Sequence, residues 1–144
     1  MAALIGSFAD VWCLAGGRDT LVAAANDSWT QFDLDLPDTV ENLGEIKEPN
    51  LERRLAAEPD LVIGSSKTAA DVELMDVLEQ AGIPVAYFEV SSFEDYLEML
   101  EICTQLTGCR ENYRQNGTEV QAQIEQAKAR VPDSGPSVLY VRAT

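Results

Sequence analysis

The sequence predicts an α/β domain, in which helices flank a parallel sheet, followed by one long helix. Between residues 2 and 108, short apolar runs alternate with amphipathic stretches, an order typical of repeated strand–helix units. Residues 109–131 differ, because apolar side chains recur there at steps of three and four with no strand between them. Repeated strand–helix–strand order indicates a parallel sheet with helices on both faces.

The composition fits one folded domain and excludes several kinds of function. The 144 residues are 46% hydrophobic, which is enough for a single core. A net charge of −15 would repel DNA, RNA and an anionic bilayer, so we expect no nucleic-acid partner. The chain has no histidine, which excludes histidine-dependent catalysis and removes the commonest transition-metal ligand. Because no nucleophile is paired with a base either, we expect no enzymatic activity, no cofactor and no metal site.

Three cysteines, Cys13, Cys103 and Cys109, occur on separate predicted elements and without C-x-x-C spacing. This pattern indicates neither a zinc site nor a redox pair. Buried structural thiols are the default expectation. A disulfide between Cys103 and Cys109 stays open for an exported protein, although the expected helix end between them makes its geometry unfavourable.

The first part of the chain contains two predicted strands and one helix. An apolar strand over residues 2–6 is followed by Ser7 as the expected N-cap of a helix over 8–15. Residues 21–25 form the second predicted strand. Residues 30–50 alternate acidic, proline and glycine positions with few apolar anchors, so we expect a long surface excursion there.

The next part adds two helices and a buried strand. Asn50 is the expected N-cap of a short helix that Pro59 stops, and residues 61–63 form an apolar strand with residues 64–66 as its exit loop. A helix is then predicted over 69–81, ended by a glycine. Its apolar residues are expected to share one face: Val72, Met75, Val77 or Leu78, and Ala81.

Residues 83–88 form the next predicted strand, with a proline tolerated only at its start. Ser91 or Ser92 caps the helix that follows, and Gly108 ends it. The helix keeps a helical apolar period throughout, as expected for an element that packs on the sheet. These units complete a Rossmann-like α/β domain over residues 1–108.

The long helix over residues 109–131 would extend roughly 34 Å at 1.5 Å per residue, which is long for a helix of an α/β layer. An amphipathic helix that packs on the domain, or on a coiled-coil partner, accounts for its apolar stripe. After a turn, residues 137–142 begin a strand. We therefore divide the chain into 1–108, 109–131 and 132–144, and expect the last segment to begin a second, truncated domain.

Residues 44–63 carry the pattern G…P-N-L-E-x-x-L-x-x-x-P-D-L-V-I. This pattern resembles the first lobe of the substrate-binding proteins of bacterial ABC importers for ferric siderophores, haem and cobalamin, the class III type with a helical backbone. The resemblance implies that residues 1–108 are an N-terminal lobe, that residues 109–131 join two lobes, and that residues 132–144 open the second lobe. A fragment with one lobe is expected to bind ligand weakly.

The resemblance also implies a function, partners and a location. A metal chelate or tetrapyrrole would be captured between two lobes and delivered to an ABC transporter permease. The protein would lie outside the cytoplasm, in the periplasm or as a cell-surface lipoprotein. It would contact the membrane only through a lipid anchor outside this sequence.

Ligand-binding residues are expected in four loops at the carboxyl ends of the strands. Helix N-termini there are expected to point unpaired backbone N–H groups outward. Together the loops offer aromatic surface, hydroxyls, one cation and carboxylates, a mixture suited to a bulky chelate. The candidates are Ser7, Phe8, Asn26, Asp27, Trp29, Ser65, Ser66, Lys67 and Glu89.

Several candidates also have a structural role open to them. Trp29 could lie flat against a planar ligand or pack over the edge of the domain. Phe8, in the first turn of a helix, could face either the binding cleft or the sheet. Lys67 could offer charge to an anionic chelate or remain solvated. Trp12, inside the first helix, is expected in the core.

Glu52 receives a role from the resemblance alone. In that family the acidic residue of P-N-L-E lies at the outer tip of the lobe and pairs with arginines of the permease. Asn50, Leu51 and Glu52 all match the motif. A glutamate near a helix N-terminus is also favoured by the helix dipole and needs no partner.

Two other functions fit the sequence less well. A flavodoxin-like or receiver-like regulatory domain shares the strand–helix order, but the residues after the first and third predicted strands supply no acidic cluster. A calcium loop beginning at Asp33 fails, because its sixth position is Asp38 instead of Gly and its twelfth is Gly44 instead of Glu.

Overall fold

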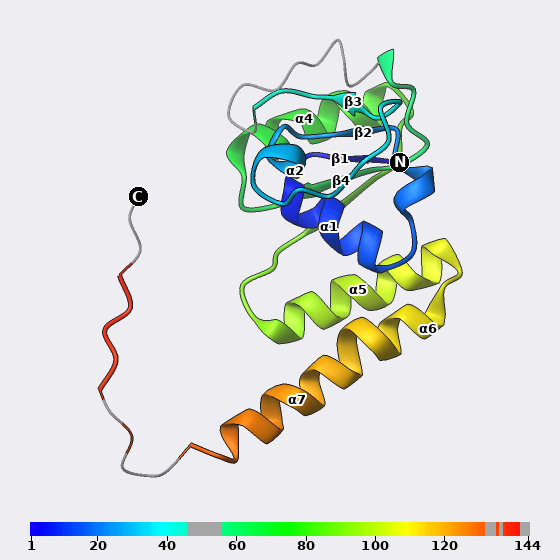
Figure 1. Cartoon of the computed structure of the whole chain (residues 1–144). Helices are drawn as coiled ribbons and strands as arrows, with labels where there is room; N and C mark the ends of the chain where they lie inside the picture. The colour runs from blue at the N-terminus through cyan, green and yellow to red at the C-terminus, as the bar shows by residue number, and fades with distance from the viewer. Residues whose placement is uncertain (46–55, 132–134, 136, 142–144) are drawn as a thin grey trace.

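A computed structural model of the chain describes residues 1–45, 56–131, 135 and 137–141. Its centre is a five-stranded sheet in which every neighbouring pair is parallel (Figure 1). This confirms the predicted α/β class. In their order across the sheet, the strands are β3 (Glu41–Asn42), β2 (Ala23–Ala24), β1 (Ala2–Ala3), β4 (Val62–Ser65) and β5 (Val85–Phe88).

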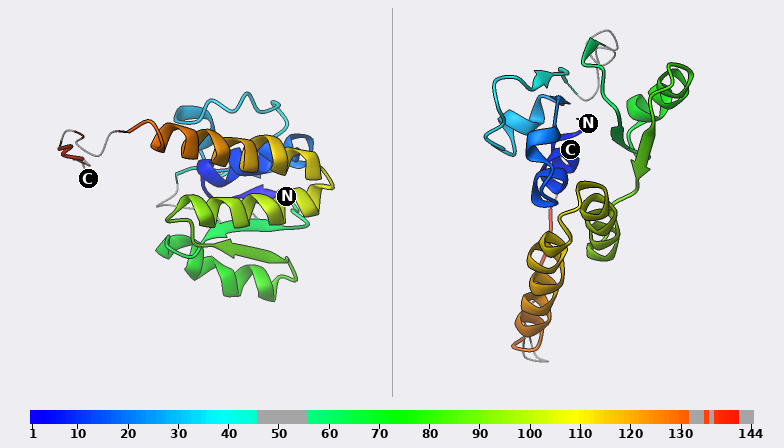
Figure 2. Two further views of the ribbon diagram at one scale, coloured as in Figure 1. Left: turned by 90° about the horizontal axis from the view of Figure 1, so that it is seen from below. Right: turned by 90° about the vertical axis from the view of Figure 1, so that its right-hand side faces the viewer.

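Helices cover both faces of the sheet (Figure 2). On one face, α1 (Gly6–Leu14) and α5 (Phe93–Thr107) bury Phe8, Met99 and other side chains against the strands. On the other face, α4 (Ala69–Gln80) packs a smaller core. β1 and β2 consist entirely of alanine and are fully buried, as expected for apolar inner strands that are covered on both faces.

The first helix begins earlier than its sequence indicates. It starts at Gly6, so Ser7 lies inside the helix and the prediction that Ser7 is its N-cap is wrong. A β-carbon at Gly6 would lie 2.8 Å from the backbone nitrogen of Ser28, so glycine allows the helix start to approach α2 (Asp27–Thr30) closely. Trp12, further along α1, is in the core as predicted.

The apolar face predicted for residues 69–81 is only partly correct. α4 buries Asp71, Leu74 and Leu78, whereas Val72 and Val77 are exposed. The helix faces the sheet along this row because the Asp71 carboxylate accepts a hydrogen bond from the Ser65 backbone N–H at 2.9 Å. A buried aspartate, which the apolar period could not reveal, sets the rotation of the helix.

Two strand boundaries also differ from their predictions. The region 30–50, predicted as a surface excursion, contains the short edge strand β3, which has too few and too polar residues for a periodic signal. Gly64 and Ser65, predicted as an exit loop, belong to β4 because they pair with Tyr87 and Phe88 of β5. A short 3-10 helix, η1 (Arg18–Thr20), connects α1 to β2.

The ends of α5 follow the predicted signals. Ser92 is the N-cap, and its hydroxyl accepts from the Asp95 backbone N–H at 3.1 Å, while the Asp95 carboxylate accepts from the Ser92 N–H. Gly108 ends the helix in the left-handed conformation, with φ of 77°. This reciprocal cap fixes where the chain enters the helix.

The three cysteines are free thiols, so the disulfide between Cys103 and Cys109 that the sequence left open is not formed. Cys103 is fully buried on α5, and burial raises its pKa to about 12. Burial also raises the pKa of the half-buried Cys13 thiol. The two thiols are therefore protonated and serve as small apolar groups.

The long helix is present but has a wider turn in it. It consists of α6 (Arg110–Tyr113), a π-helical turn η2 (Arg114–Thr118) and α7 (Glu119–Lys128). Figure 2 shows α7 running away from the sheet, and none of its residues is buried. The predicted apolar stripe is thus buried at Gly117, half-buried at Val120 and Ile124, and exposed at Ala127 and Val131.

Residues 137–141 do not form the predicted strand. Their apolar side chains are exposed, for example Leu139 at 87%, and a strand needs a hydrogen-bonded neighbour that the described residues do not supply. The short helix predicted from Asn50 lies largely outside the described residues. No helix in the described part of the chain is long and apolar enough to cross a bilayer.

Candidate functional site

A cavity of about 420 Å³ opens where strands β1, β4 and β5 end. Because the strands are parallel, their carboxyl ends meet at one edge of the sheet, and ligands of α/β proteins bind at this edge. The size is within the usual range of ligand pockets. Its lining residues are Ile5, Ser7, Phe8, Asp10, Val11, Ser65, Val90 and Tyr96.

Three of the predicted ligand-binding residues line this cavity. Ser7 and Phe8 come from the first turn of α1, and Ser65 is the last residue of β4. The Phe8 ring is 5% exposed and meets Phe88 edge to face, with ring centroids 6.2 Å apart. Phe8 therefore supports the floor of the cavity and belongs to the core at the same time.

Asp10 and Tyr96 are the functional candidates that sequence reasoning missed. Asp10 lies one helical turn after Ser7, so both side chains are on the same face of α1. Tyr96 lies in the first turn of α5, just after its Ser92 cap. Both residues lie within five positions of the start of a helix that follows a strand, and this distance could have identified them from the sequence.

Asp10 is half-buried beside the cavity and has no hydrogen bond or ion pair within the described part of the chain. Burial raises the pKa of its carboxyl, and the positive charge of Arg18 partly offsets this shift. The Arg18 guanidinium does not line the cavity, because it donates to the backbone oxygens of Leu34 and Asp35 at 2.7 and 2.9 Å. Asp10 is thus a partly desolvated carboxylate with no direct partner among these residues.

Tyr96 connects the cavity to the long helix. Its hydroxyl donates to the backbone oxygen of Asn116 in the π-helical turn at 2.9 Å. Burial, and to a lesser degree the charge of Asp10, raise the pKa of the Tyr96 hydroxyl. The hydroxyl oxygen remains able to accept one further hydrogen bond.

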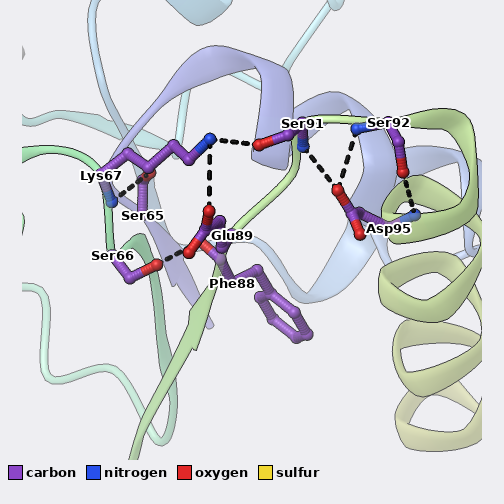
Figure 3. Close-up of polar contacts among 8 residues, drawn as sticks. All are labelled: Ser65, Ser66, Lys67, Phe88, Glu89, Ser91, Ser92 and Asp95. Carbon is purple, nitrogen blue, oxygen red and sulfur yellow. Dashed lines mark hydrogen bonds and ion pairs between the residues drawn. The ribbon is translucent and has the colours of Figure 1, made fainter.

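Lys67, Glu89 and Ser91 meet on the rim beyond the cavity (Figure 3). The Lys67 ammonium lies 3.3 Å from the Glu89 carboxylate and hydrogen bonds to the Ser91 hydroxyl. Ser66 is adjacent and donates to the Phe88 backbone oxygen at 3.3 Å. The predicted candidates Ser66, Lys67 and Glu89 therefore come together, but on an exposed rim where the cation already has a carboxylate partner.

Some of the N–H groups that were expected to be unpaired at the helix N-termini near this cavity are bonded to carboxylates. The Gly6 N–H, which starts α1, donates to both carboxylate oxygens of Asp27 at 2.9 Å. The Asp95 carboxylate accepts hydrogen bonds from the N–H groups of Ser91 and Ser92 at 2.8 and 2.9 Å. These hydrogen bonds lower the pKa of the Asp95 carboxyl. Aspartates of the chain itself occupy the positions where an anionic ligand would otherwise bind.

The remaining predicted candidates lie away from the cavity. Asp27 is buried as the cap just described, and Asn26 holds the neighbouring loop, donating to Glu45 and accepting from Asn42, both at 2.8 Å. Trp29 is half-buried and packs against the main core. Glu52 lies outside the described residues.

A hollow of about 260 Å³ is located between α5 and α6 and is lined by Glu101, Arg110 and Tyr113 among others. It faces away from the strand ends, and its walls are mainly exposed polar side chains. Among the described residues, no group of three or more Cys, Asp or Glu side chains is placed to hold a metal ion. The cavity at the strand ends is therefore the better candidate for a ligand site.

The domain has a parallel sheet, a cavity at the carboxyl edge of that sheet, and a long helix that leaves the domain. These features are typical of α/β domains that bind ligands. The sequence profile of one family, described as periplasmic binding protein, matches residues 2–144. The chain belongs to the periplasmic binding protein family. No curated protein sequence matched it.

Solved structures of similar fold include three bacterial binding proteins. The periplasmic haem-binding protein HutB of Vibrio cholerae is 24% identical, with a TM-score of 0.74, covering 92% of this chain and 50% of that one. The vitamin B12-binding protein BtuF of Vibrio cholerae is 19% identical, with a TM-score of 0.74 and coverages of 90% and 49%. A possible iron-binding, periplasmic solute-binding protein from Staphylococcus epidermidis is 16% identical, with a TM-score of 0.77 and coverages of 92% and 51%. The chain spans about half the length of the structures it matches.

Proposed function

We propose that this chain forms the N-terminal lobe of a solute-binding component of an ABC importer that captures a metal chelate. The cavity at the ends of β1, β4 and β5 is the observation that carries the proposal. Family membership supports it, as do the haem, vitamin B12 and iron named for proteins of the same fold. The function is binding without catalysis.

In this proposal, residues 109–131 join the lobe to a second lobe, which residues 132–144 begin. Ligand is held between the two lobes, with the cavity as the contribution of this one. A helical connection permits smaller closing motions than a loop hinge. The protein works outside the cytoplasm, in the periplasm or anchored to the cell surface as a lipoprotein.

Ligand binding tests the proposal directly. We expect the full-length protein to bind at least one of three classes of ligand: a ferric siderophore, haem or cobalamin. Binding should be measurable as quenching of tryptophan fluorescence during a titration. Phe8→Ala, which removes part of the cavity floor, should weaken that binding. Absence of binding to all three classes would refute the proposal.

Delivery to the permease is a separate part of the proposal and rests on Glu52. Glu52→Arg should abolish import by cells while ligand binding by the purified protein remains normal, because a reversed charge would repel permease arginines. Glu73→Arg, at an exposed position of α4, is the matched control and should import normally. Normal import by Glu52→Arg would remove the docking role and leave the binding role intact.

A further inference from the structure

The charge distribution around the cavity restricts the class of ligand. Asp10 is the charged residue among those that line the cavity, and none of these lining residues is lysine or arginine. Of the nearby cations, Lys67 is paired with Glu89, and Arg18 is bonded to backbone oxygens. The residues that line the cavity therefore carry one negative charge and no positive one, while the Arg18 charge acts on Asp10 from outside the cavity.

Backbone donors do not reverse this charge. The N–H group at the start of α1 is bonded to Asp27, and those that precede α5 are bonded to Asp95. The Ser65 N–H, at the end of β4, is bonded to Asp71. At these three places, where a parallel α/β fold can bind an anion, a carboxylate of the chain already accepts the hydrogen bonds.

Asp10 itself is placed to receive a hydrogen-bond donor. Its carboxylate is half-buried, and within the described residues nothing donates to it. Partial burial without a partner is unfavourable for a carboxylate, and a bound cation would remove that cost. Around it, Ile5, Val11 and Val90 supply an apolar wall suited to the hydrocarbon part of a ligand.

We propose that the cavity binds the cationic, hydrogen-bond-donating end of a ferric chelate, with Asp10 as the counter-ion of that end. This inference rests on the proposed function and names the ligand class within it: neutral or positively charged chelates, such as ferric trihydroxamates that carry an ammonium group. Triply negative ferric tris-catecholates and haem, with its two propionates, are disfavoured by the same carboxylate.

A pair of chelates that differ in one charge tests the inference. Ferric Desferal is a trihydroxamate complex with a free ammonium, and acetylation of that amine leaves the same iron complex without the charge. The full-length protein should bind ferric Desferal roughly tenfold more tightly than its N-acetyl form, the size expected for one charge-assisted hydrogen bond. Asp10→Asn should reduce this ratio to about one.

Asp19→Asn, at an exposed position of η1 outside the cavity, is the matched control and should keep the tenfold ratio. Circular dichroism should show that both variants are folded. Equal binding of the two Desferal complexes by the wild-type protein, or an unchanged ratio in Asp10→Asn, would overturn the inference.

The failures of the two proposals are distinguishable. Tighter binding of ferric tris-catecholate or haem than of ferric Desferal would overturn the charge preference, while the importer function would stand. Absence of binding to any ferric chelate, haem or cobalamin would overturn both.

Discussion

At the scale of single residues, Asp10 is a site where binding and stability are expected to conflict. Burial raises the pKa of its carboxyl above the ordinary value of 3.8. As pH rises, the unfolded chain therefore loses this proton before the folded chain does. The free energy of unfolding therefore falls as pH rises from 3.8 to the folded-state pKa of Asp10. Above that pKa the loss of stability stays constant.

Asp10→Asn should consequently stabilise the protein at pH 7 and have no effect below pH 3.8. Because the group is half exposed and solvent screens it, we expect a gain below about 1 kcal/mol, or at most roughly 3 °C in Tm. Urea unfolding of both proteins between pH 3.5 and pH 7 measures the effect. Lower stability of the variant at pH 7 would show that Asp10 has a native partner.

Asp27 has the opposite role, since its carboxylate completes the start of α1. Asp27→Ala should lower the free energy of unfolding by about 1–3 kcal/mol, because it leaves the buried Gly6 N–H without an acceptor. Urea unfolding at pH 7 provides the measurement. Asp38→Ala, at an exposed loop position, is the control and should stay within about 0.5 kcal/mol of wild type.

The sequence predicted which residues lie beside the cavity where the backbone alone determines their position. Ser7, Phe8 and Ser65 follow from strand ends and line the cavity. Asn26, Asp27 and Trp29 also follow a strand, but buried hydrogen bonds and core packing direct these side chains elsewhere. Such side-chain pairings are tertiary contacts, which no local pattern of residue types encodes.

At the scale of elements, the π-helical turn anchors the long helix to the lobe. The Asn116 side chain donates to the Leu14 backbone oxygen at 3.0 Å, and Asn112 donates to the same oxygen at 3.0 Å. Tyr96 from the cavity donates to the backbone oxygen of Asn116. The wide turn therefore joins the cavity wall, the end of α1 and the long helix.

Asn116→Ala should destabilise this junction by about 1 kcal/mol, the usual net value of one internal hydrogen bond. Amide hydrogens of residues 114–118 should exchange faster, because the turn loses one of its attachments to α1. Gln115→Ala, at the exposed neighbouring position, should alter neither quantity. Unchanged exchange in Asn116→Ala would show that Asn112 and Tyr96 hold the turn without it.

Most elements were predictable because caps, glycines and apolar periods are local signals. The end of α5 at Gly108 and the start of α4 at Ala69 coincide with the predictions. The edge strand β3 and the rotation of α4 were not predictable, since the first depends on pairing with β2 and the second on the buried Asp71. Pairing and buried polar contacts are set by the assembled sheet.

At the scale of the whole molecule, the net charge of −15 is expected to weaken the fold through self-repulsion. Attractive pairs do exist, such as Lys128 with Glu125 at 2.8 Å and Arg114 with Glu111. These pairs are exposed, and each contributes only about 0–1 kcal/mol. The sequence has 25 acidic residues and ten basic ones, so most acidic groups cannot be paired with a cation and repulsion should dominate.

Sodium chloride should therefore stabilise the protein at pH 7. Between 10 and 100 mM salt the screening length falls from about 30 to about 10 Å, which removes long-range repulsion and spares contacts within an ion pair. We expect Tm to rise by about 2–4 °C, the equivalent of roughly 1 kcal/mol for a chain of this size. Near pH 4.1, the isoelectric point, positive and negative charges balance and the rise should disappear. A fall in Tm with salt at pH 7 would contradict this prediction. Salt weakens attraction and repulsion alike, and the folded state loses stability only if attraction between charges is the larger of the two.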